Sequence, residues 1–329
     1  PTKPSIGLKV LVPYFLGFRK KLAPEHMLLN LKNQASKQLH ANPNTEPASV
    51  ITIDNTVMSA FALKDYDTFG KGVQALADLW HEAEKLLYQT GIGSNTAASI
   101  SIRLDGIAMT TMEDQRAPQQ VLEALGNIGG NAINDGLDRT LGSNLLTLRR
   151  LGLEAVETGL ENLTYKAVQQ LDLMGRKVAD KGWENATADV ILYLNNIGVE
   201  AAKRGMDLPL DKAVPSLGQI GLDSINKGLD EFAKFVTLSL GAVGVEAGEK
   251  GLTSEAKEAG YWLTILGACA VHKSDMDLRS EAADNLRGIE KATGTNIISF
   301  AFWKARNYAS VQLGYSATEQ DLAEFAKSF

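Results

Sequence analysis

The sequence has 329 residues, of which 44% are hydrophobic and 22% are charged, and this balance excludes an intrinsically disordered chain. A single cysteine, Cys269, excludes an intramolecular disulfide framework and suits a reducing compartment such as the cytoplasm. No run of about 18 apolar residues occurs, so these residues contain no complete membrane span.

Charge is distributed unevenly along the chain. The first 50 residues hold seven Lys/Arg against two Glu, a net charge of +5, which leaves −11 for the remainder of a chain whose total is −6. An acidic body of this kind is not expected to bind nucleic acid, because nucleic-acid binding requires a basic surface.

Four basic residues flank the apolar stretch VLVPYFLGF (10–18): Lys9, Arg19, Lys20 and Lys21. This pairing is typical of a segment at a membrane surface, or of the cytoplasmic flank of a membrane span. The alternative is a solvated arm whose apolar residues dock on the body, and Pro13 favours it by interrupting any long helix here.

In chain order, residues 1–69 are predicted to be an irregular, basic and partly helical segment, with a helix over 25–39. Residues 70–294 are predicted to form an array of about ten helices, and residues 295–329 to form capping helices at its end.

A 23-residue repeat defines the array, with phrases such as IGVEAAKRGMD (197–207) and IGLDSINKGLD (220–230) recurring in phase. Each repeat has four residue types at fixed offsets that mark one face of an α-helix. They are a leucine, an apolar residue that we take as the reference position, a glycine, and a small or β-branched residue. The glycine column comprises Gly129, Gly152, Gly175, Gly198, Gly221, Gly244 and Gly267.

A second glycine column marks the end of each predicted helix. Each of these glycines precedes an apolar residue, a pattern typical of the Schellman ending with a left-handed glycine. The column comprises Gly136, Gly159, Gly182, Gly205, Gly228 and Gly251. The helices that follow are predicted to have polar N-caps at Thr164, Thr187, Asp230 and Thr253.

Each repeat is therefore one helix of about 18 residues, and the short connections make successive helices antiparallel. A glycine within a helix costs about 1 kcal/mol relative to alanine. We expect it to leave a notch in which a neighbouring helix packs closely; a hinge is the alternative. The predicted fold is an all-α superhelix with a 23-residue single-helix repeat and a 46-residue hairpin, as in HEAT-like or armadillo-like α-solenoids.

Alternate repeats share a glutamate, which places Glu154, Glu200 and Glu246 at intervals of 46 residues. Equivalent positions in stacked hairpins line up on one surface, so the three carboxylates form a candidate site for a protein or peptide partner. The alternative interpretation is a solvated flank of every second helix.

Five aromatic residues near the end of the chain are predicted to form a hydrophobic plug that closes the last repeat, with a partner-docking patch as the alternative. They are Phe300, Phe302, Trp303, Tyr308 and Tyr315.

Catalytic and cofactor signatures are missing from the sequence. It contains neither the phosphate-loop pattern nor the GxSxG nucleophile elbow. Cys269 and His272 share a helical face, but two ligands are too few for zinc. No cofactor, metal or catalytic residue is therefore predicted.

Two stretches carry a further resemblance. LAPEHMLLNLKNQ (22–34) followed by KDYDTFGKGVQAL (64–76) resembles the cytoplasmic part of predicted prokaryotic membrane proteins of unknown function. The resemblance implies transmembrane helices before a cytoplasmic region, and it brings no catalytic residues.

The leading hypothesis is a non-enzymatic helical-repeat scaffold that binds a protein or peptide in the cytoplasm, at the inner face of a membrane through its N-terminus. One alternative is a sensor that binds a small molecule between helices or on the glutamate row. The other is an enzyme built on a closed α/α toroid, which the uniformly short turns disfavour.

Overall fold

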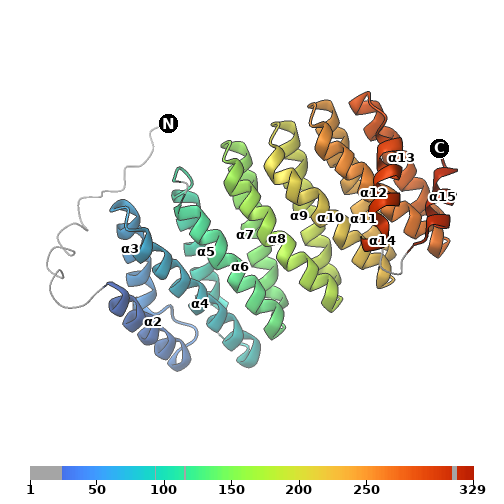
Figure 1. Ribbon diagram of the computed structural model, residues 1–329. Helices are drawn as coiled ribbons and strands as arrows, with labels where there is room; N and C mark the ends of the chain where they lie inside the picture. The colour runs from blue at the N-terminus through green and yellow to red at the C-terminus, as the bar shows by residue number, and fades with distance from the viewer. Residues whose placement is uncertain (1–23, 93, 115, 313–316) are drawn as a thin grey trace. The chain divides into compact units, whose positions relative to one another are not determined.

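The computed structural model describes residues 24–329 except 93, 115 and 313–316 (Figure 1). These described residues form fourteen α-helices and no strand, which confirms the predicted all-α helical-repeat class. The chain divides after Ile107 into two compact units. None of the described helices is long and apolar enough to cross a membrane.

The first unit is built from α2 (Pro24–Ala41), α3 (Ala48–Ala62), α4 (Tyr66–Thr90) and most of α5 (Ser94–Thr110). The 46-residue spacing is already present here. Ser36 of α2 donates a hydrogen bond to Glu82 of α4 (2.6 Å), and Lys32 pairs with Asp78 between the same helices.

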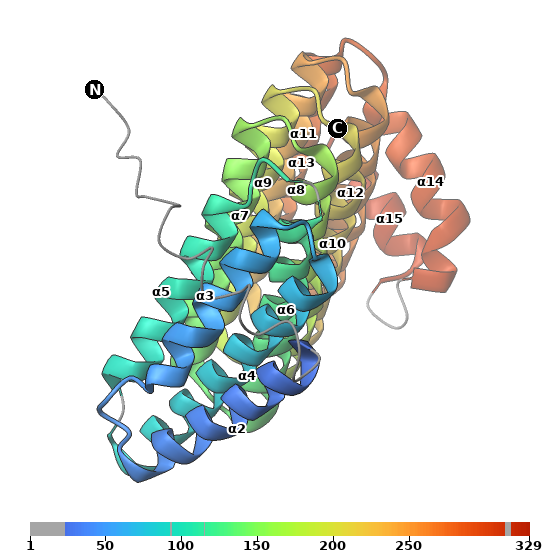
Figure 2. The ribbon, with the colours of Figure 1, turned by 90° about the vertical axis from the view of Figure 1, so that its left-hand side faces the viewer.

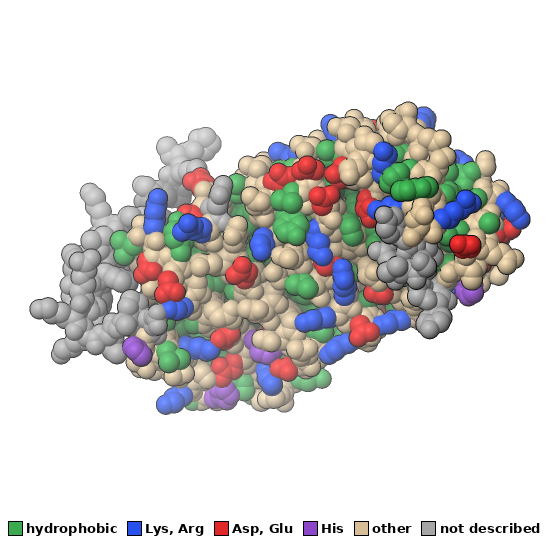
Figure 3. Space-filling view, viewed as in Figure 1, with side chains coloured by type: hydrophobic (Ala, Val, Ile, Leu, Met, Phe, Trp, Pro, Cys, Tyr) green, Lys and Arg blue, Asp and Glu red, His purple; other side chains and the backbone are tan. Residues whose placement is uncertain are grey.

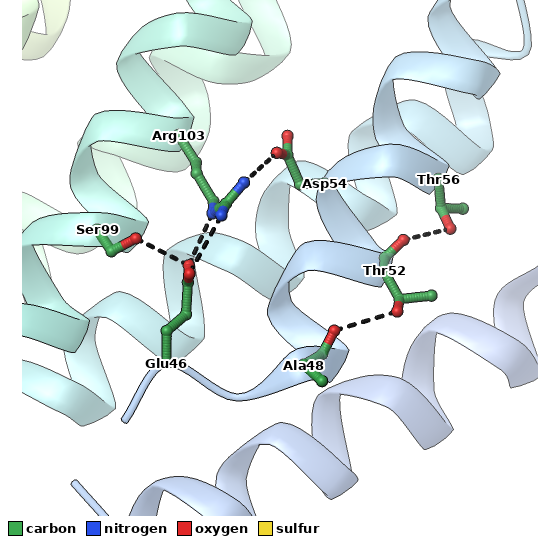
Figure 4. Close-up of polar contacts among 7 residues, drawn as sticks. All are labelled: Glu46, Ala48, Thr52, Asp54, Thr56, Ser99 and Arg103. Carbon is green, nitrogen blue, oxygen red and sulfur yellow. Dashed lines mark hydrogen bonds and ion pairs between the residues drawn. The ribbon is translucent and has the colours of Figure 1, made fainter. Parts of the chain in front are cut away.

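Arg103 of α5 holds the first unit together at a second point (Figure 4). Its Nε donates to Glu46 Oε1 (2.7 Å) in the loop before α3, and its Nη1 donates to Asp54 Oδ2 (2.6 Å) in α3. Ser99 donates to the same Glu46 oxygen (2.8 Å). The hydrogen bond from Arg103 lowers the pKa of Glu46. The half-buried charges are thus paired with each other, which suits a structural link between helices.

The second unit contains the regular repeats, in ten helices. They are α6 (Ala117–Asp135), α7 (Asp138–Glu157), α8 (Glu161–Lys181), α9 (Glu184–Lys203), α10 (Asp207–Asn226), α11 (Asp230–Glu249), α12 (Thr253–Lys273), α13 (Met276–Thr293), α14 (Ile297–Gln312) and α15 (Glu319–Ala326).

Each helix from α6 to α12 contacts the next helix and the next but one. Within this unit the helices therefore form two rows (Figure 2). The even row contains α6, α8, α10 and α12, and the odd row contains α7, α9, α11 and α13. This is the arrangement of stacked antiparallel hairpins that the 46-residue spacing predicts.

The predicted Schellman endings are confirmed. The six glycines of the second column have φ between +70° and +77°. The residue after each glycine returns a hydrogen bond to the small-residue column, as in Leu160 N to Ala155 O (2.8 Å) and Met206 N to Ala201 O (3.0 Å). A left-handed glycine lets the chain reverse within two residues.

The four predicted N-caps are wrong. The helices begin at Glu161, Glu184, Asp230 and Thr253, each capped by an apolar residue that makes no side-chain cap hydrogen bond. Thr164 and Thr187 lie inside their helices and donate to the carbonyl four residues earlier. The turn is so short that the apolar residue closing one helix also begins the next, which leaves no position for a polar cap.

The helix-interior glycines form the predicted notches. A Cβ added to Gly152 would lie 2.5 Å from Ile197 Cδ1, and one added to Gly244 would lie 2.4 Å from Ile289 Cδ1. In both cases the intruding side chain comes from the reference position of the next-but-one helix. Contacts shorter than van der Waals distance leave no room for a methyl group, so glycine is needed for close packing between rungs.

The last notch is filled differently. At Gly267 of α12 the intruding group is the ring of Phe325 from α15, whose Cζ would lie 2.3 Å from an added Cβ. Phe302 packs against Phe325 with ring centroids 5.7 Å apart. The predicted aromatic plug is thus correct for Phe302, whereas Trp303 is exposed and the side chains of Tyr308 and Tyr315 lie outside the described residues.

Three lysines tie the even row together at its C-terminal edge. Lys227 Nζ donates to the carbonyl of Ala179 (2.9 Å), which belongs to the last turn of the preceding even helix. Lys181 and Lys273, which lie 46 residues to either side, make the same contact with the carbonyls of Ile133 and Ile225. Each lysine places its positive charge at the C-terminal end of the preceding even helix, where the helix dipole favours a cation.

Candidate functional site

Three leucines lie exposed along the odd row at intervals of 46 residues. Leu146 of α7 is 45% exposed, Leu192 of α9 is 39% exposed and Leu238 of α11 is 50% exposed. Because α7 contacts α9 and α9 contacts α11, the leucines form a continuous row across three neighbouring helices. Single exposed leucines are ordinary on protein surfaces, but three in register on neighbouring helices form an apolar strip, which makes this surface a candidate interaction site.

A second apolar row runs parallel to the first. It contains Leu153, Val199 and Val245, which lie seven residues further along the same helices and are half-buried. Seven residues span about 10 Å of an α-helix. Arg150, Asn196 and Ala242 lie between the two rows. We call the two apolar rows and the residues between them the binding face.

The three predicted glutamates border this face. Glu154, Glu200 and Glu246 each follow the second apolar row by one residue, and all three are half-buried. Lys203 donates to Glu200 Oε1 (2.7 Å). This hydrogen bond, together with the charge of Glu246 on the next helix of the row, raises the pKa of Lys203. The structure therefore brings members of the row to equivalent positions, while their role in binding stays a prediction.

The glutamate border is only partly neutralised. Among the described residues, Glu200 is paired with Lys203, but Glu154, Glu246 and Glu249 form no ion pair. A half-exposed carboxylate that forms no ion pair keeps part of its field available to a charged partner. One border of the binding face is therefore acidic.

The leucine row was not predicted, although its signal is present in the amino-acid sequence. Leu146, Leu192 and Leu238 share the 46-residue spacing of the glutamates and fall outside the buried columns. The four basic residues predicted to lie near a membrane lie outside the described residues: Lys9, Arg19, Lys20 and Lys21.

Cys269 and His272 do not form a reactive pair. Burial of Cys269 raises the pKa of its thiol to about 12, so the thiol stays protonated near neutral pH and is a poor nucleophile. His272 is exposed and faces Asp321 of α15 (3.3 Å). Across the described residues, no group of three or more His, Cys, Asp or Glu side chains is placed to hold a metal ion.

Comparison with known proteins bears on the fold alone. No protein family's sequence profile matches the chain, and the search of curated proteins gave no match either. Among solved structures, the chain is similar to one described as a "Circular tandem repeat protein with novel repeat topology and enhanced subunit contact surfaces". The TM-score is 0.54 at 14% identity, over 88% of this chain and 74% of the other. The chain therefore has a helical tandem-repeat scaffold fold.

Proposed function

We propose that the protein is a non-catalytic helical-repeat scaffold that binds a protein or peptide partner on the binding face of α7, α9 and α11. The exposed leucine row at 46-residue spacing carries this proposal. An apolar strip presented three times in register, beside a border of carboxylates, provides burial and orientation for a partner. The buried, protonated Cys269 supports a function that does not use a nucleophilic thiol.

Site-specific photo-crosslinking tests the proposal. A benzophenone amino acid replaces Ala242, which is exposed between the two apolar rows. In the cells that make the protein we expect crosslinks to a partner, and their loss when Leu192 is also changed to Asp. Leu173 on α8 is 51% exposed and belongs to the even row, so Leu173→Asp is the matched control and should leave the crosslinks unchanged. Equal loss in both variants would contradict the proposal.

We also propose that the scaffold acts in the cytoplasm with its basic N-terminal segment at the inner face of a membrane. The charges of Lys9, Arg19, Lys20 and Lys21 beside an apolar stretch support this placement. The full chain should sediment with vesicles that contain phosphatidylserine and stay in the supernatant with phosphatidylcholine alone. Charge reversal of the four residues should abolish sedimentation, and unchanged sedimentation would refute the placement.

A further inference from the structure

We infer that the occupant of the binding face is an amphipathic α-helix with basic residues along one flank, lying across α7, α9 and α11. The inference rests on the proposed function and specifies its partner. It follows from three properties of the face: the interval between the leucines, the interval between the two apolar rows, and the charge of the border.

The interval between leucines matches the period of a helix. Helices in contact lie about 8–10 Å apart, so consecutive leucines of the row are separated by roughly that distance. An α-helix advances about 10.5 Å in seven residues and returns the same face to the surface. Apolar residues at every seventh position of a partner helix would therefore meet Leu146, Leu192 and Leu238 in turn.

An extended strand does not fit the same interval. Residues two apart in a strand share a face at about 6.7 Å, and residues four apart at about 13 Å. Neither distance matches the separation of the leucines. A polyproline helix returns the same face every three residues, at about 9 Å, and does match along the row.

The width of the face decides between the two helical forms. The leucine row and the row of Leu153, Val199 and Val245 are about 10 Å apart along α7, α9 and α11. An α-helix with its side chains is about 10–12 Å in diameter, so one helix contacts both rows at once. At the α11 end, the exposed residue between the rows is Ala242, and its small side chain allows close approach.

The acidic border sets the charge of the partner. Glu154 and Glu246 lie at the two ends of the glutamate row and have no ion pair within the described residues, so lysines or arginines on one flank of the partner would face them. A second copy of this chain would bring the same carboxylates against each other, which like-charge repulsion disfavours. An anionic membrane or a nucleic acid is disfavoured for the same reason.

A synthetic peptide tests the inference directly. The probe has leucine at every seventh position and one apolar neighbour per turn, with lysines along one flank and a fluorophore at one end. Its binding to the full chain is followed by fluorescence anisotropy. We expect saturable binding that weakens by about tenfold or more in Leu192→Asp and does not change in Leu173→Asp. Circular dichroism of both variants confirms that they are folded.

Exchanging the charges of the peptide and the protein tests the assignment of a basic partner. A second peptide with glutamates in place of the lysines should bind about tenfold more weakly. Its binding should recover in a Glu154→Lys, Glu246→Lys variant, which in turn should bind the lysine peptide less tightly. Equal binding of both peptides to the wild-type chain would overturn the charge assignment.

A random peptide library separates this inference from the proposed function. Peptides that bind wild type and Leu173→Asp but not Leu192→Asp are sequenced. Basic amphipathic helices among them support the inference. Proline-rich, extended or acidic peptides would overturn it while the scaffold function stands. A library that yields no peptide dependent on Leu192 would overturn both.

Discussion

The even and odd rows of the second unit are built from the same repeat, yet their outer surfaces are used differently. On the even row, Lys227 caps the preceding rung, and Asp172 of α8 pairs with Lys212 of α10 at 2.6 Å. Figure 3 shows the face on which α14 lies, where acidic and basic side chains are interspersed and hydrophobic ones form small separate groups.

On the odd row, the middle of each of α7, α9 and α11 carries one residue of the leucine row and one of the second apolar row. Its clearest tie between rungs is at the helix ends, where Arg204 donates to the carbonyl of Glu157 (3.0 Å). At the centres of the odd rungs, besides the core columns, Arg149 of α7 lies over the ring of Tyr193 of α9, 5.4 Å from the ring centroid. The comparison predicts that the two rows respond differently to mutation.

The largest effect is expected at an even-row notch. A Cβ on Gly218 of α10 would lie 2.0 Å from Trp262 Cδ2 of α12, so Gly218→Ala should destabilise the protein by about 3 kcal/mol through overpacking. Chemical denaturation monitored by circular dichroism measures the change. Gly142 on α7 has no neighbouring atom within 4 Å of an added Cβ. Gly142→Ala should therefore stabilise the protein by about 0.5–1 kcal/mol, and a loss of stability would show that this position is not open.

The next effect concerns the buried carboxylate of the even row. The Asp172 side chain is 3% exposed and pairs with Lys212 and with Arg176 (2.9 Å). Asp172→Ala leaves both cations without their partner in a partly buried site and should cost about 2 kcal/mol in unfolding free energy. Asp180 also pairs with a lysine but is 86% exposed, so Asp180→Ala should change stability by less than about 0.5 kcal/mol. Similar losses in the two variants would show that burial does not decide the effect.

A smaller, pH-dependent effect is expected at Glu255 of α12. Burial raises the pKa of this carboxyl, with further contributions from the charges of Asp211 and Asp207. The folded protein therefore holds the Glu255 proton more tightly than the unfolded chain. Stability from this group is full below the unfolded pKa and is lost as the pH rises through the folded pKa.

Glu255→Gln keeps the neutral side chain at all pH values. It should stabilise the protein at pH 7 by less than about 1 kcal/mol and leave stability at pH 3 unchanged. Thermal unfolding at both pH values measures the difference. A variant less stable than wild type at pH 7 would show that the ionised carboxylate is favoured in the fold.

The smallest effect on stability is expected on the binding face itself. Leu192 is 39% exposed and lies outside the buried core, so Leu192→Ser should change the unfolding free energy by about 0.5 kcal/mol at most. The same change should abolish crosslinking from position 242. A large loss of stability would mean that the leucine row is part of the core and not a binding face.

Much of the fold could be predicted from the sequence because the spacing of apolar residues and glycines in each repeat indicates how the helices pack. Close helix packing explains the glycine column through Gly152 and Gly244, and a left-handed backbone explains the glycines that end the helices. Each cause is local, and it recurs in every repeat, so the pattern is visible in the sequence. The N-caps failed because an apolar residue serves two helices at once, which no propensity scale describes. Phe325 was missed because it reaches the array from outside the repeat, so no register points to it.

The candidate site was predictable only in part. The glutamate row follows directly from the 46-residue spacing. The leucine row has the same spacing, but an apolar residue in a helix is ordinarily assigned to the core. Its exposure depends on the rotation of each helix about its axis, which the packing of both neighbouring rungs sets. Raised pKa values at Glu255 and Asp211 depend on side chains from two helices and have no local signal.

The ring of Phe325 has a consequence for stacking on α12. Every earlier notch receives the next-but-one helix, so each rung provides the seat for a later one. At Gly267 that seat is already taken by a side chain from α15. Another rung, whether from an insertion or from a neighbouring molecule, would have to expel the aromatic ring before it could stack. The ring of Phe325 thus occupies the position on α12 in which a further rung would otherwise seat its side chain.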